Sequence, residues 1–350
     1  MHLPPPTALL GGHLATGLVD VASDPSALES KGFWAVAADF EGRLTCARFR
    51  DVRRTEQRDL PAAPWHGPRA DAWSTSLDRR AYQNGVTRIR EHIAAGAVYQ
   101  ANLCRVLFAP VETGADVGAL AGSLARHNPA PYAGFVRLPR HGVEVATASP
   151  ELFLRRDGGE VTSGPIKGTG RTEADLLEKD HAENVMIVDL VRNDLGRVCV
   201  PGSVTVPDLC AVEKHPGLVH LVSTVRGRLR DGLGWPELLA ATFPPGSVTG
   251  APKESALKII ETLETSPRGP YCGGIGWVDA DRGRGELAVG IRTFWIDSAE
   301  GLLKFGTGAG ITWGSDPERE WLETELKASR LLAIASADSG GRLGWTRAAH

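Results

Sequence analysis

The sequence predicts an α+β fold with mostly antiparallel sheets. Apolar, β-branched segments arrive in runs, and amphipathic segments with helical spacing interrupt these runs at irregular intervals. A doubly wound parallel sheet would instead alternate strand and helix regularly. The chain has 350 residues, of which 42% are hydrophobic and 23% are charged, so it is long enough to bury a sizeable core.

The first part of the chain predicts strands followed by a helix. The stretches "FWAVAADF" (33–40) and "LTCARFR" (44–50) are apolar, and a polar connection follows at 58–73. We therefore expect a short β-rich segment over 1–75, a main domain over 76–335 and a tail over 336–350. After residue 78, Val86, Ile89 and Ile93 recur at helical spacing until Gly96, which predicts an amphipathic helix feeding a strand.

The middle of the chain predicts strands and then a long helix. "GFVRLP" (134–139), "VEVATAS" (143–149) and "ELFLRRDGGEVTS" (151–163) are strand-like and are separated by glycine or proline turns. This places Glu151 at a strand edge and Lys167 in the loop beyond. The residues 173–196 have apolar positions at helical intervals and end at Gly196, and the β-branched stretch 218–229 predicts another strand.

The last third predicts a glycine loop, two strands and a final helix. In "FPPGSVTGAPKESALKIIETLE" (243–264), Pro252 occupies the expected first position of a helix. The stretches 286–297 and 301–312 read as single strands joined by a short polar turn, so we expect them to pair as a hairpin. The final helix is expected to begin at Asp316-Pro317.

Charge and cysteine content favour small-molecule chemistry inside the cell. The formal net charge is −3 with both signs interspersed, so no basic footprint for nucleic acid or anionic lipid is expected. The chain contains no run of about 18 apolar residues and no signal-peptide pattern, which predicts a cytoplasmic protein without membrane insertion. The odd number of cysteines and the lack of CxxC spacing make a disulfide framework or zinc site unexpected. They are Cys46, Cys104, Cys199, Cys210 and Cys272.

Three acidic residues on predicted helices could hold a hard metal ion. Glu320 and Glu323 lie three apart and share a helix face, and Glu183 lies on the long helix. Mg²⁺ prefers one or two carboxylates and fills its other positions with water and substrate oxygens. The alternative is a surface ion pair between Glu323 and Lys327.

Two glycine-rich stretches could bind an anion. "PPGSVTGAPK" presents Ser247 and Thr249 before a helix, where unpaired amides favour a carboxylate, although its spacing does not match a nucleotide-binding loop. "GTGAG" (306–310) could turn amides toward a ligand, and Arg292 on the preceding strand could pair with a carboxylate. An ordinary capped turn, a β-bulge and a solvated arginine are the alternatives.

A lysine between glycines is the remaining candidate. An amine is a nucleophile only when it is unprotonated, and the glycines around Lys167 would let the backbone approach a ligand without Cβ clashes. A solvated loop lysine is the alternative. His220, in "LVHLVST", could serve a site or be a hydrogen-bonded core residue.

Taken together, nine motifs resemble a known family. In order they are "VYQANL", "SPELF", "PIKGT", "ENVMIVDLVRNDLGRV", "PGSVTGAPK", "GPYCGGIGW", "GIRTF", "GAGI" and "EREWLETELKA". Over residues 80–335 they resemble the chorismate-utilising enzymes, which include anthranilate, aminodeoxychorismate, isochorismate and salicylate synthases. The resemblance implies a sandwich-like core with helices packed outside.

Within this resemblance two positions indicate the reaction. Water-adding members carry a lysine base where this chain has Gln100, whereas amine-adding members carry glutamine. Anthranilate synthases resemble "PIAGT" where this chain has "PIKGT", and aminodeoxychorismate synthases use the lysine, here Lys167, as a covalent nucleophile. The chain is therefore most similar to aminodeoxychorismate synthase component I. Such a chain receives ammonia from a glutamine amidotransferase partner, since no glutaminase domain is recognisable here.

The resemblance also implies roles for individual residues. Lys167 would attack C2 of chorismate, and Glu151 would protonate the departing C4 hydroxyl. The implied magnesium ligands are Glu183, Glu320 and Glu323. The implied substrate-binding residues are Gln100, His220, Ser247, Thr249, Tyr271, Arg292, Gly308, Ala309, Gly310 and Lys327.

The chain departs from the family pattern beside Lys167. Family members commonly read "RPIKGTRPR", whereas here Gly164 replaces the first arginine and "GRT" follows the threonine, with a shorter segment before Glu183. We therefore expect the Lys167 loop to be anchored differently. Two other functions remain: an anthranilate synthase component I, and a non-catalytic relative that binds chorismate.

Overall fold

The computed structural model describes residues 4–55, 64–170, 172–176, 178–215 and 218–336. The predicted tail thus lies, from residue 337 onward, outside the described residues. The helices are α1 (Arg79–Ala94), α2 (Val117–His127), α3 (Glu178–Gly196), α4 (Trp235–Thr242), α5 (Lys253–Leu263) and α6 (Pro317–Ala335). The first nine strands are β1 (Thr7–Leu10), β2 (His13–Ala22), β3 (Phe33–Ala38), β4 (Leu44–Arg54), β5 (Ser74–Thr75), β6 (Gln100–Pro110), β7 (Tyr132–Leu138), β8 (Val143–Ser149) and β9 (Leu152–Asp157). The others are β10 (Glu160–Gly164), β11 (Ile166–Gly170), β12 (Thr205–His215), β13 (Leu218–Arg228), β14 (Gly250–Ala251), β15 (Gly274–Asp279), β16 (Arg284–Val289), β17 (Thr293–Asp297) and β18 (Leu302–Ile311).

These strands form one continuous antiparallel sheet. Successive pairings run β12, β13, β10, β9, β16, β15, β3, β4, β2, β1, β7, β8, β17, β18 and β6. β11 also pairs with β13, and β14 and β5 pair with β6. The α+β prediction is confirmed, and six helices accompany the sheet in the described part of the chain.

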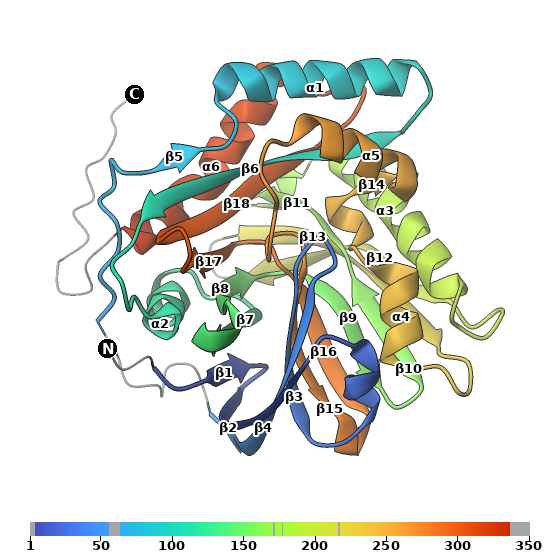
Figure 1. Ribbon diagram of the computed structural model, residues 1–350. Coiled ribbons are helices and arrows are strands. Elements are labelled where there is room, and N and C mark those ends of the chain that lie inside the picture. The colour runs from blue at the N-terminus through green and yellow to red at the C-terminus, as the bar shows by residue number, and fades with distance from the viewer. Residues whose placement is uncertain (1–3, 56–63, 171, 177, 216–217, 337–350) are drawn as a thin grey trace.

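The pair β6 and β18 separates a helix-covered face from a polar face. Figure 1 shows these two long strands side by side below α1. On one face, Leu103, Ala309 and Ile311 are buried in an apolar cluster that includes residues of α1 and α5. Side chains alternate between the two faces of a strand, so Gln100 and Asn102 lie on the other face. This alternation directs polar groups into the interior of the molecule.

Two further apolar clusters fill the remaining interior. One contains residues of α2 and α6 together with residues of β6, β7, β8, β17 and β18. The larger one joins β3, β4, β9, β15 and β16 to α3 and α4. Because β1 pairs with β7 and β3 pairs with β15, the first strands of the chain are built into the same sheet as the rest.

Several local predictions agree with the structure. β17 and β18 pair as the predicted hairpin, and α3 ends at Gly196. α1 ends at Ala94, and Gly96 follows with a φ of +74° that favours glycine. The final helix begins at Pro317, and its N-cap Asp316 accepts a hydrogen bond from the backbone amide of Arg319.

Other local predictions were wrong. The stretch predicted as a single strand over 286–297 is divided into β16, which pairs with β15 and β9, and β17, which pairs with β8 and β18. Arg292 lies between them with a left-handed φ of +53°, which turns the chain from one set of partners to the other. The long helix begins at Glu178 rather than at residue 173, where only a short 3₁₀ turn forms. Pro252 is the N-cap of α5 and not its first helical residue.

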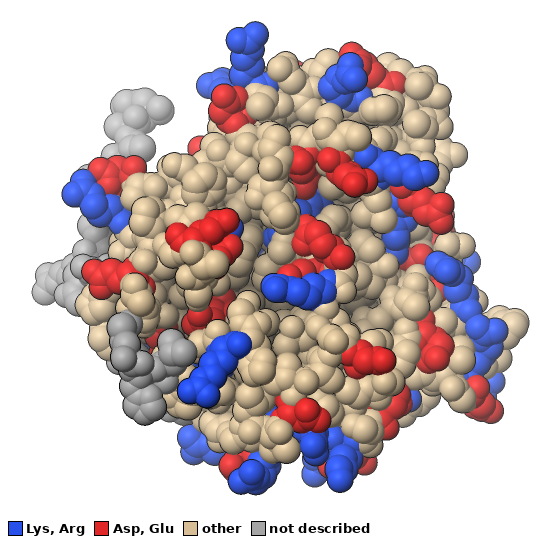
Figure 2. Space-filling view, viewed as in Figure 1, with Lys and Arg blue, Asp and Glu red and all other residues tan. Residues whose placement is uncertain are grey.

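The surface and the cysteines agree with the composition. Figure 2 shows basic and acidic side chains interspersed over the face in view, without a field of one sign. Within the described ranges, every helix is too short or too polar to cross a membrane. All five cysteines fall in those ranges, and none forms a disulfide.

Candidate active site

The floor of the candidate site is the polar face of β6 beside β14 and β18. Gln100 pairs with Ala251 of β14, and its side chain is completely buried. Neither its amide nitrogen nor its amide oxygen has a hydrogen-bond partner among the described residues. Buried polar groups are almost always paired, so this amide is prepared for a partner that a ligand brings.

Backbone amides of β18 point away from β6 at the predicted glycines. Opposed residues in an antiparallel pair alternate between exchanging two hydrogen bonds and exchanging none. The N–H groups of Asn102 and Cys104 donate elsewhere, to Thr249 O at 2.7 Å and to the Glu264 carboxylate at 2.8 Å. Their partners Gly310 and Gly308 therefore direct their own N–H groups off the free edge of β18.

Ala309 is oriented differently from its two glycine neighbours. Its side chain is buried in the cluster that contains residues of α1 and α5. The same alternation turns its N–H toward β6. Of the three predicted residues, Gly308 and Gly310 therefore present amides to a ligand, and Ala309 packs the opposite face.

Lys167 lies on a strand, so its prediction as a loop residue was wrong. Lys167 pairs with Leu221 of β13, and the register shifts before the next pair, between Thr169 and His220. Gly168 occupies this bulge with a φ of +74°, and a Cβ there would lie 2.9 Å from Cβ of Asp180 on α3. Glycine is required at this position, both for the left-handed backbone and for the close approach of α3.

The bulge aims the Lys167 amine at the loop before β14. Its Nζ donates to the backbone oxygen of Ser247 at 3.1 Å. Asn102 Nδ2 donates to the same oxygen at 3.4 Å. The Ser247 carbonyl thus connects Lys167 on β11 to Asn102 on β6. Strands near the two ends of the long sheet come together at this point.

The loop containing Ser247 and Thr249 is closed internally. These residues lie in or next to a 3₁₀ turn over Gly246–Val248, several residues before α5 begins. The Thr249 hydroxyl donates to Pro245 O and Gly246 O, both at 3.2 Å. The prediction of free amides at a helix start was therefore wrong for Thr249, whose N–H also donates within the turn. The loop contributes carbonyl acceptors and the Ser247 hydroxyl instead.

Glu151 is a buried acid beside the Lys167 amine. It lies between β8 and β9 with 3% of its surface exposed. Burial raises the pKa of Glu151 to about 7, although a hydrogen bond from Ser247 and the charge of Lys167 oppose the shift. A carboxyl group with this pKa holds a proton near neutral pH and can act as a general acid.

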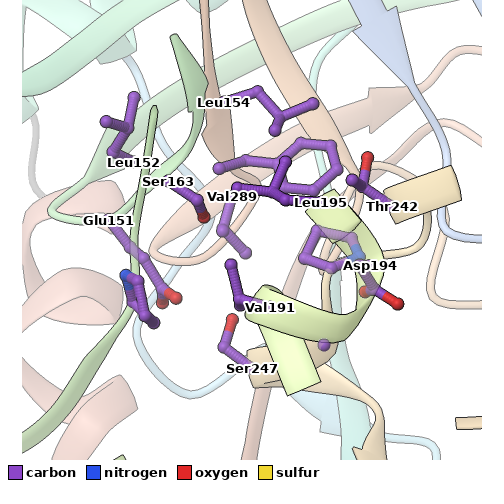
Figure 3. A pocket seen from close by; sticks show the side chains of 14 residues that line it. Glu151, Leu152, Leu154, Ser163, Val191, Asp194, Leu195, Thr242, Ser247 and Val289 are labelled. Carbon is purple, nitrogen blue, oxygen red and sulfur yellow. The ribbon is translucent and has the colours of Figure 1, made fainter. Parts of the chain in front are cut away.

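A small cavity borders Glu151 on its α3 side. Glu151 and Ser247 line one part of it, and Val191, Asp194 and Leu195 of α3 line another (Figure 3). Its volume of about 20 Å³ is enough for a single water molecule. The walls are mostly apolar, which is consistent with the raised pKa of the Glu151 carboxyl.

The three predicted metal-binding carboxylates influence one another electrostatically. Burial raises the pKa of Glu183, which Lys167 opposes and Glu323 reinforces. Burial also raises the pKa of Glu320, and Glu323 adds to this shift. Burial acts on Glu323 in the same direction, but nearby lysines, led by Lys327, lower its pKa overall.

Lys327 connects these carboxylates to β18. Its Nζ lies 2.6 Å from Glu323 Oε1, which is the ion pair expected from their spacing. The same Nζ donates to Gly308 O at 3.1 Å. Glu323 of α6 is therefore held next to the edge of β18 at which the Gly308 and Gly310 N–H groups point away from β6.

The donor set fits a magnesium ion, although it does not by itself enclose one. Among the described residues, no three His, Cys, Asp or Glu side chains come close enough together to hold a metal. Mg²⁺ commonly binds through one or two carboxylates and keeps water or substrate oxygens as its other ligands. Glu183 and Glu320 are carboxyl groups whose ionised form is destabilised by burial, and a bound cation would stabilise that form.

The predicted Arg292 and Tyr271 occupy different environments. Burial lowers the pKa of Arg292, and the positive charge of Arg330 lowers it further. Among the described groups, the charged neighbour that acts on Arg292 is thus a cation. Such a guanidinium favours an anionic ligand. Tyr271 is buried against β18, and a Cβ atom at Gly306 would lie 2.0 Å from the Tyr271 ring. The Tyr271 hydroxyl accepts a hydrogen bond from Cys104 Sγ at 3.9 Å. His220 is buried on β13.

Sequence reasoning missed Asn102 and a buried ion pair that supports it. Arg268 lies 2.6 Å from Glu264 and donates to Val248 O and Asn102 O, which ties the Ser247 loop to β6. Asn102 could have been found from its place two residues after Gln100, because this spacing puts both on one strand face. The only sequence signal for the Glu264–Arg268 ion pair is its i,i+4 spacing. Exposed helix faces often carry charged residues at this spacing, so it did not distinguish a buried pair.

Comparisons with known proteins identify the family of this chain. Residues 28–333 match the family model described as chorismate binding enzyme. The chain is 40% identical over 271 residues to anthranilate synthase component 1 of Saccharolobus solfataricus, an alignment that covers 74% of this chain and 63% of that protein. It is 37% identical over 319 residues to aminodeoxychorismate synthase component 1 of Salmonella typhimurium, covering 85% and 68% respectively. The chain thus spans about two thirds of the length of both relatives.

A solved structure shows the same fold. Anthranilate synthase component I from Streptococcus pneumoniae superimposes with a TM-score of 0.77 at 23% identity, covering 95% of this chain and 93% of that one. At this identity the likeness concerns the fold alone. The family match extends over most of the chain and includes every strand and helix that lines the candidate site. The chain therefore belongs to the family of chorismate binding enzymes.

Proposed function

We propose that this chain is an aminodeoxychorismate synthase component I, which converts chorismate and ammonia to 4-amino-4-deoxychorismate. The observation that carries the proposal is the position of Lys167, whose amine donates to the Ser247 carbonyl that also accepts from Asn102, two residues after Gln100 on β6. A nucleophilic lysine on β11 and a nonbasic glutamine on β6 suit addition of an amine through a covalent intermediate.

The proposed first step uses Lys167 and Glu151. The neutral amine of Lys167 bonds to C2 of the ring, the two conjugated ring double bonds shift from C1=C2 and C5=C6 to C1=C6 and C4=C5, and the C4–O bond breaks. The departing hydroxyl takes the proton of Glu151 and leaves as water. The raised pKa of Glu151 supports this role, since an acid ionised at neutral pH could not donate.

The second step reverses the shift of both ring double bonds. Ammonia bonds to C4, and Lys167 leaves C2 as a neutral amine. The new C4 ammonium group returns one proton to the Glu151 carboxylate, so the enzyme regains its starting state. The net reaction is chorismate plus ammonia giving 4-amino-4-deoxychorismate plus water, with the amine on the carbon that carried the hydroxyl.

Substrate carboxylates would be held by donors for which the described residues provide no acceptor. Arg292 and the free amides of Gly308 and Gly310 suit the enolpyruvyl carboxylate. Glu183, Glu320 and Glu323 would hold Mg²⁺, which neutralises the ring carboxylate when bound. A glutamine amidotransferase partner would supply ammonia, as the name component 1 of the relatives suggests.

One assay tests this function. The protein is incubated with chorismate, Mg²⁺ and ammonium, and products are identified by mass spectrometry for wild type, Lys167→Ala and a control, Lys31→Ala, at an exposed lysine before β3. We expect aminodeoxychorismate from wild type and Lys31→Ala, and loss of turnover in Lys167→Ala. Omission of Mg²⁺ with a chelator should also stop turnover.

Anthranilate synthase is the second candidate, because a relative with that name is 40% identical. Pyruvate and anthranilate as products would establish it and refute the proposal. Chorismate binding without any product, unaffected by Lys167→Ala, would instead indicate a non-catalytic relative.

A further inference from the structure

Two buried amides on one face of β6 are left incomplete by the protein. Besides both polar atoms of Gln100, the side-chain oxygen of Asn102 has no hydrogen-bond partner in the described part of the chain. Gln100 is fully buried, and Asn102 has 8% of its surface exposed. Leaving such a group unpaired costs about 1–3 kcal/mol, so two adjacent ones indicate a bound partner.

The two amides converge on one point opposite Gly310. Gly310 is the β18 partner of Asn102. A Cβ atom at Gly310 would lie 2.2 Å from Gln100 Nε2 and 3.3 Å from Asn102 Oδ1. The absence of a side chain at this position therefore makes room for the Gln100 amide beside the Asn102 oxygen.

The orientation of Asn102 is fixed by its neighbours. Its Nδ2 donates to Ser247 O, which is also the acceptor for Lys167 Nζ. A flipped amide would place two oxygens against each other, so Oδ1 must face the open side. The backbone is anchored as well, because Asn102 N donates to Thr249 O at 2.7 Å and Asn102 O accepts from Arg268.

The Gln100 amide nitrogen faces this point, but neither polar atom of that amide has a partner among the described residues, so a half-turn of the amide brings its oxygen there instead. We propose that, in this orientation, the amide oxygens of Asn102 and Gln100 bind the ammonia nucleophile, which makes Asn102 a second residue that selects and positions it. This inference rests on the proposed function and deepens it. Ammonia has three N–H donors and one lone pair, so two acceptors can hold it while the lone pair remains free to attack C4. A carboxylate of chorismate would be repelled by two carbonyl-type oxygens.

The neutral character of both acceptors also selects the reactive form. A carboxylate at this place would favour ammonium, which has no lone pair to donate. Amide oxygens carry no formal charge and are too weakly basic to take a proton, so they accept N–H bonds from neutral ammonia. For the same reason they cannot activate water as a base.

Steady-state kinetics with ammonium chloride test the proposal. Loss of one hydrogen bond in Asn102→Leu should raise the KM for ammonium about 3- to 10-fold. Binding of chorismate without ammonium, measured by calorimetry, should change less than twofold. The matched control is Asn128→Leu, since Asn128 also has a buried, unpartnered amide nitrogen but lies at the C-cap of α2.

A second variant separates binding from a structural role. In Asn102→Asp a carboxylate replaces the amide and should hold ammonium. Ammonium held there is unreactive and competes with ammonia, so the kcat of the variant at saturating ammonium chloride, as a ratio to that of wild type, should rise with pH as the share of ammonium falls, a change that lost packing would not produce. A pH-independent ratio, or weakened chorismate binding in Asn102→Leu with an unchanged ammonium KM, would overturn the inference.

The outcomes also separate this inference from the proposed function. If wild type forms no aminated product, both fail. If wild type aminates chorismate while Asn102→Leu and Asn128→Leu have the same ammonium KM, the function stands and the ammonia site is refuted.

Discussion

Replacing Glu151 by glutamine should make the protein more stable at alkaline pH than wild type. The pKa of the buried Glu151 carboxyl is raised from 4.5 to about 7. Because this pKa is raised, Glu151 makes its full contribution to the free energy of unfolding below pH 4.5, and this contribution is lost as pH rises through about 7. At high pH the wild type must bury an ionised carboxylate, whereas Glu151→Gln buries a neutral amide of similar shape.

The size of this effect follows from linkage. A rise from 4.5 to about 7 corresponds to about 3 kcal/mol in total, because a tenfold change in an equilibrium constant is worth about 1.4 kcal/mol. Most of it falls inside an accessible range: about 2.5 kcal/mol between roughly pH 5 and pH 8. The difference between the two proteins isolates Glu151, since all other titrating groups are shared.

Urea unfolding at half-unit pH intervals measures this difference. The free energy of unfolding of Glu151→Gln minus that of wild type should increase with pH and level off above about pH 7. Glu112→Gln, at an exposed position after β6, is the matched control and should give a flat difference. A flat difference for Glu151→Gln as well would refute the argument that this carboxyl is neutral and buried near pH 7.

Three other substitutions test the backbone, the buried ion pair and the anion site. Gly168→Ala should lower the free energy of unfolding by about 1–3 kcal/mol, because Gly168 has a left-handed φ that alanine adopts only with strain. The control is Gly159→Ala, which should change this free energy little because the space around its Cβ position is open. Equal urea midpoints for the two variants would contradict the prediction. Arg268→Met should lower the free energy of unfolding by about 3–5 kcal/mol in the same assay, because Glu264 stays buried without its partner. A decrease of less than about 1 kcal/mol would show that the pair is solvated. Arg292→Lys should raise the KM for chorismate about tenfold, since an ammonium cannot form a bidentate pair, and an unchanged KM would exclude Arg292 from carboxylate binding.

Elements with strong local signals could be predicted from the sequence. The α1 pattern, the β17–β18 hairpin and the end of α3 each depend on spacing or glycine within a short window. The helices α2 and α4 were not predicted. α2 is rich in small residues and largely buried, so its polar face is weak. α4 has only 8 residues, too few for a periodic signal.

Site geometry required long-range information. Glycines around Lys167 suggested a loop, but pairing with β13 makes the segment a strand. The close approach of α3 explains why residue 168 is a glycine. The family resemblance identified Gln100 and Lys167 as important, yet no local pattern indicated that the Ser247 carbonyl links Lys167 to Asn102. Likewise, the burial that raises the pKa of Glu151 comes from several separate elements.

The position of β6 has a consequence for how the protein is made. This strand is buried between β18 and the Ser247 loop, partners that follow it by well over a hundred residues. At about 5–20 residues per second, the ribosome needs roughly 10–40 s after completing β6 before β18 has been synthesised. During that delay an apolar strand with open edges is exposed to other nascent chains. We therefore expect folding yield in cells to depend on chaperones that bind extended apolar segments, and to improve when translation between β6 and β18 is faster.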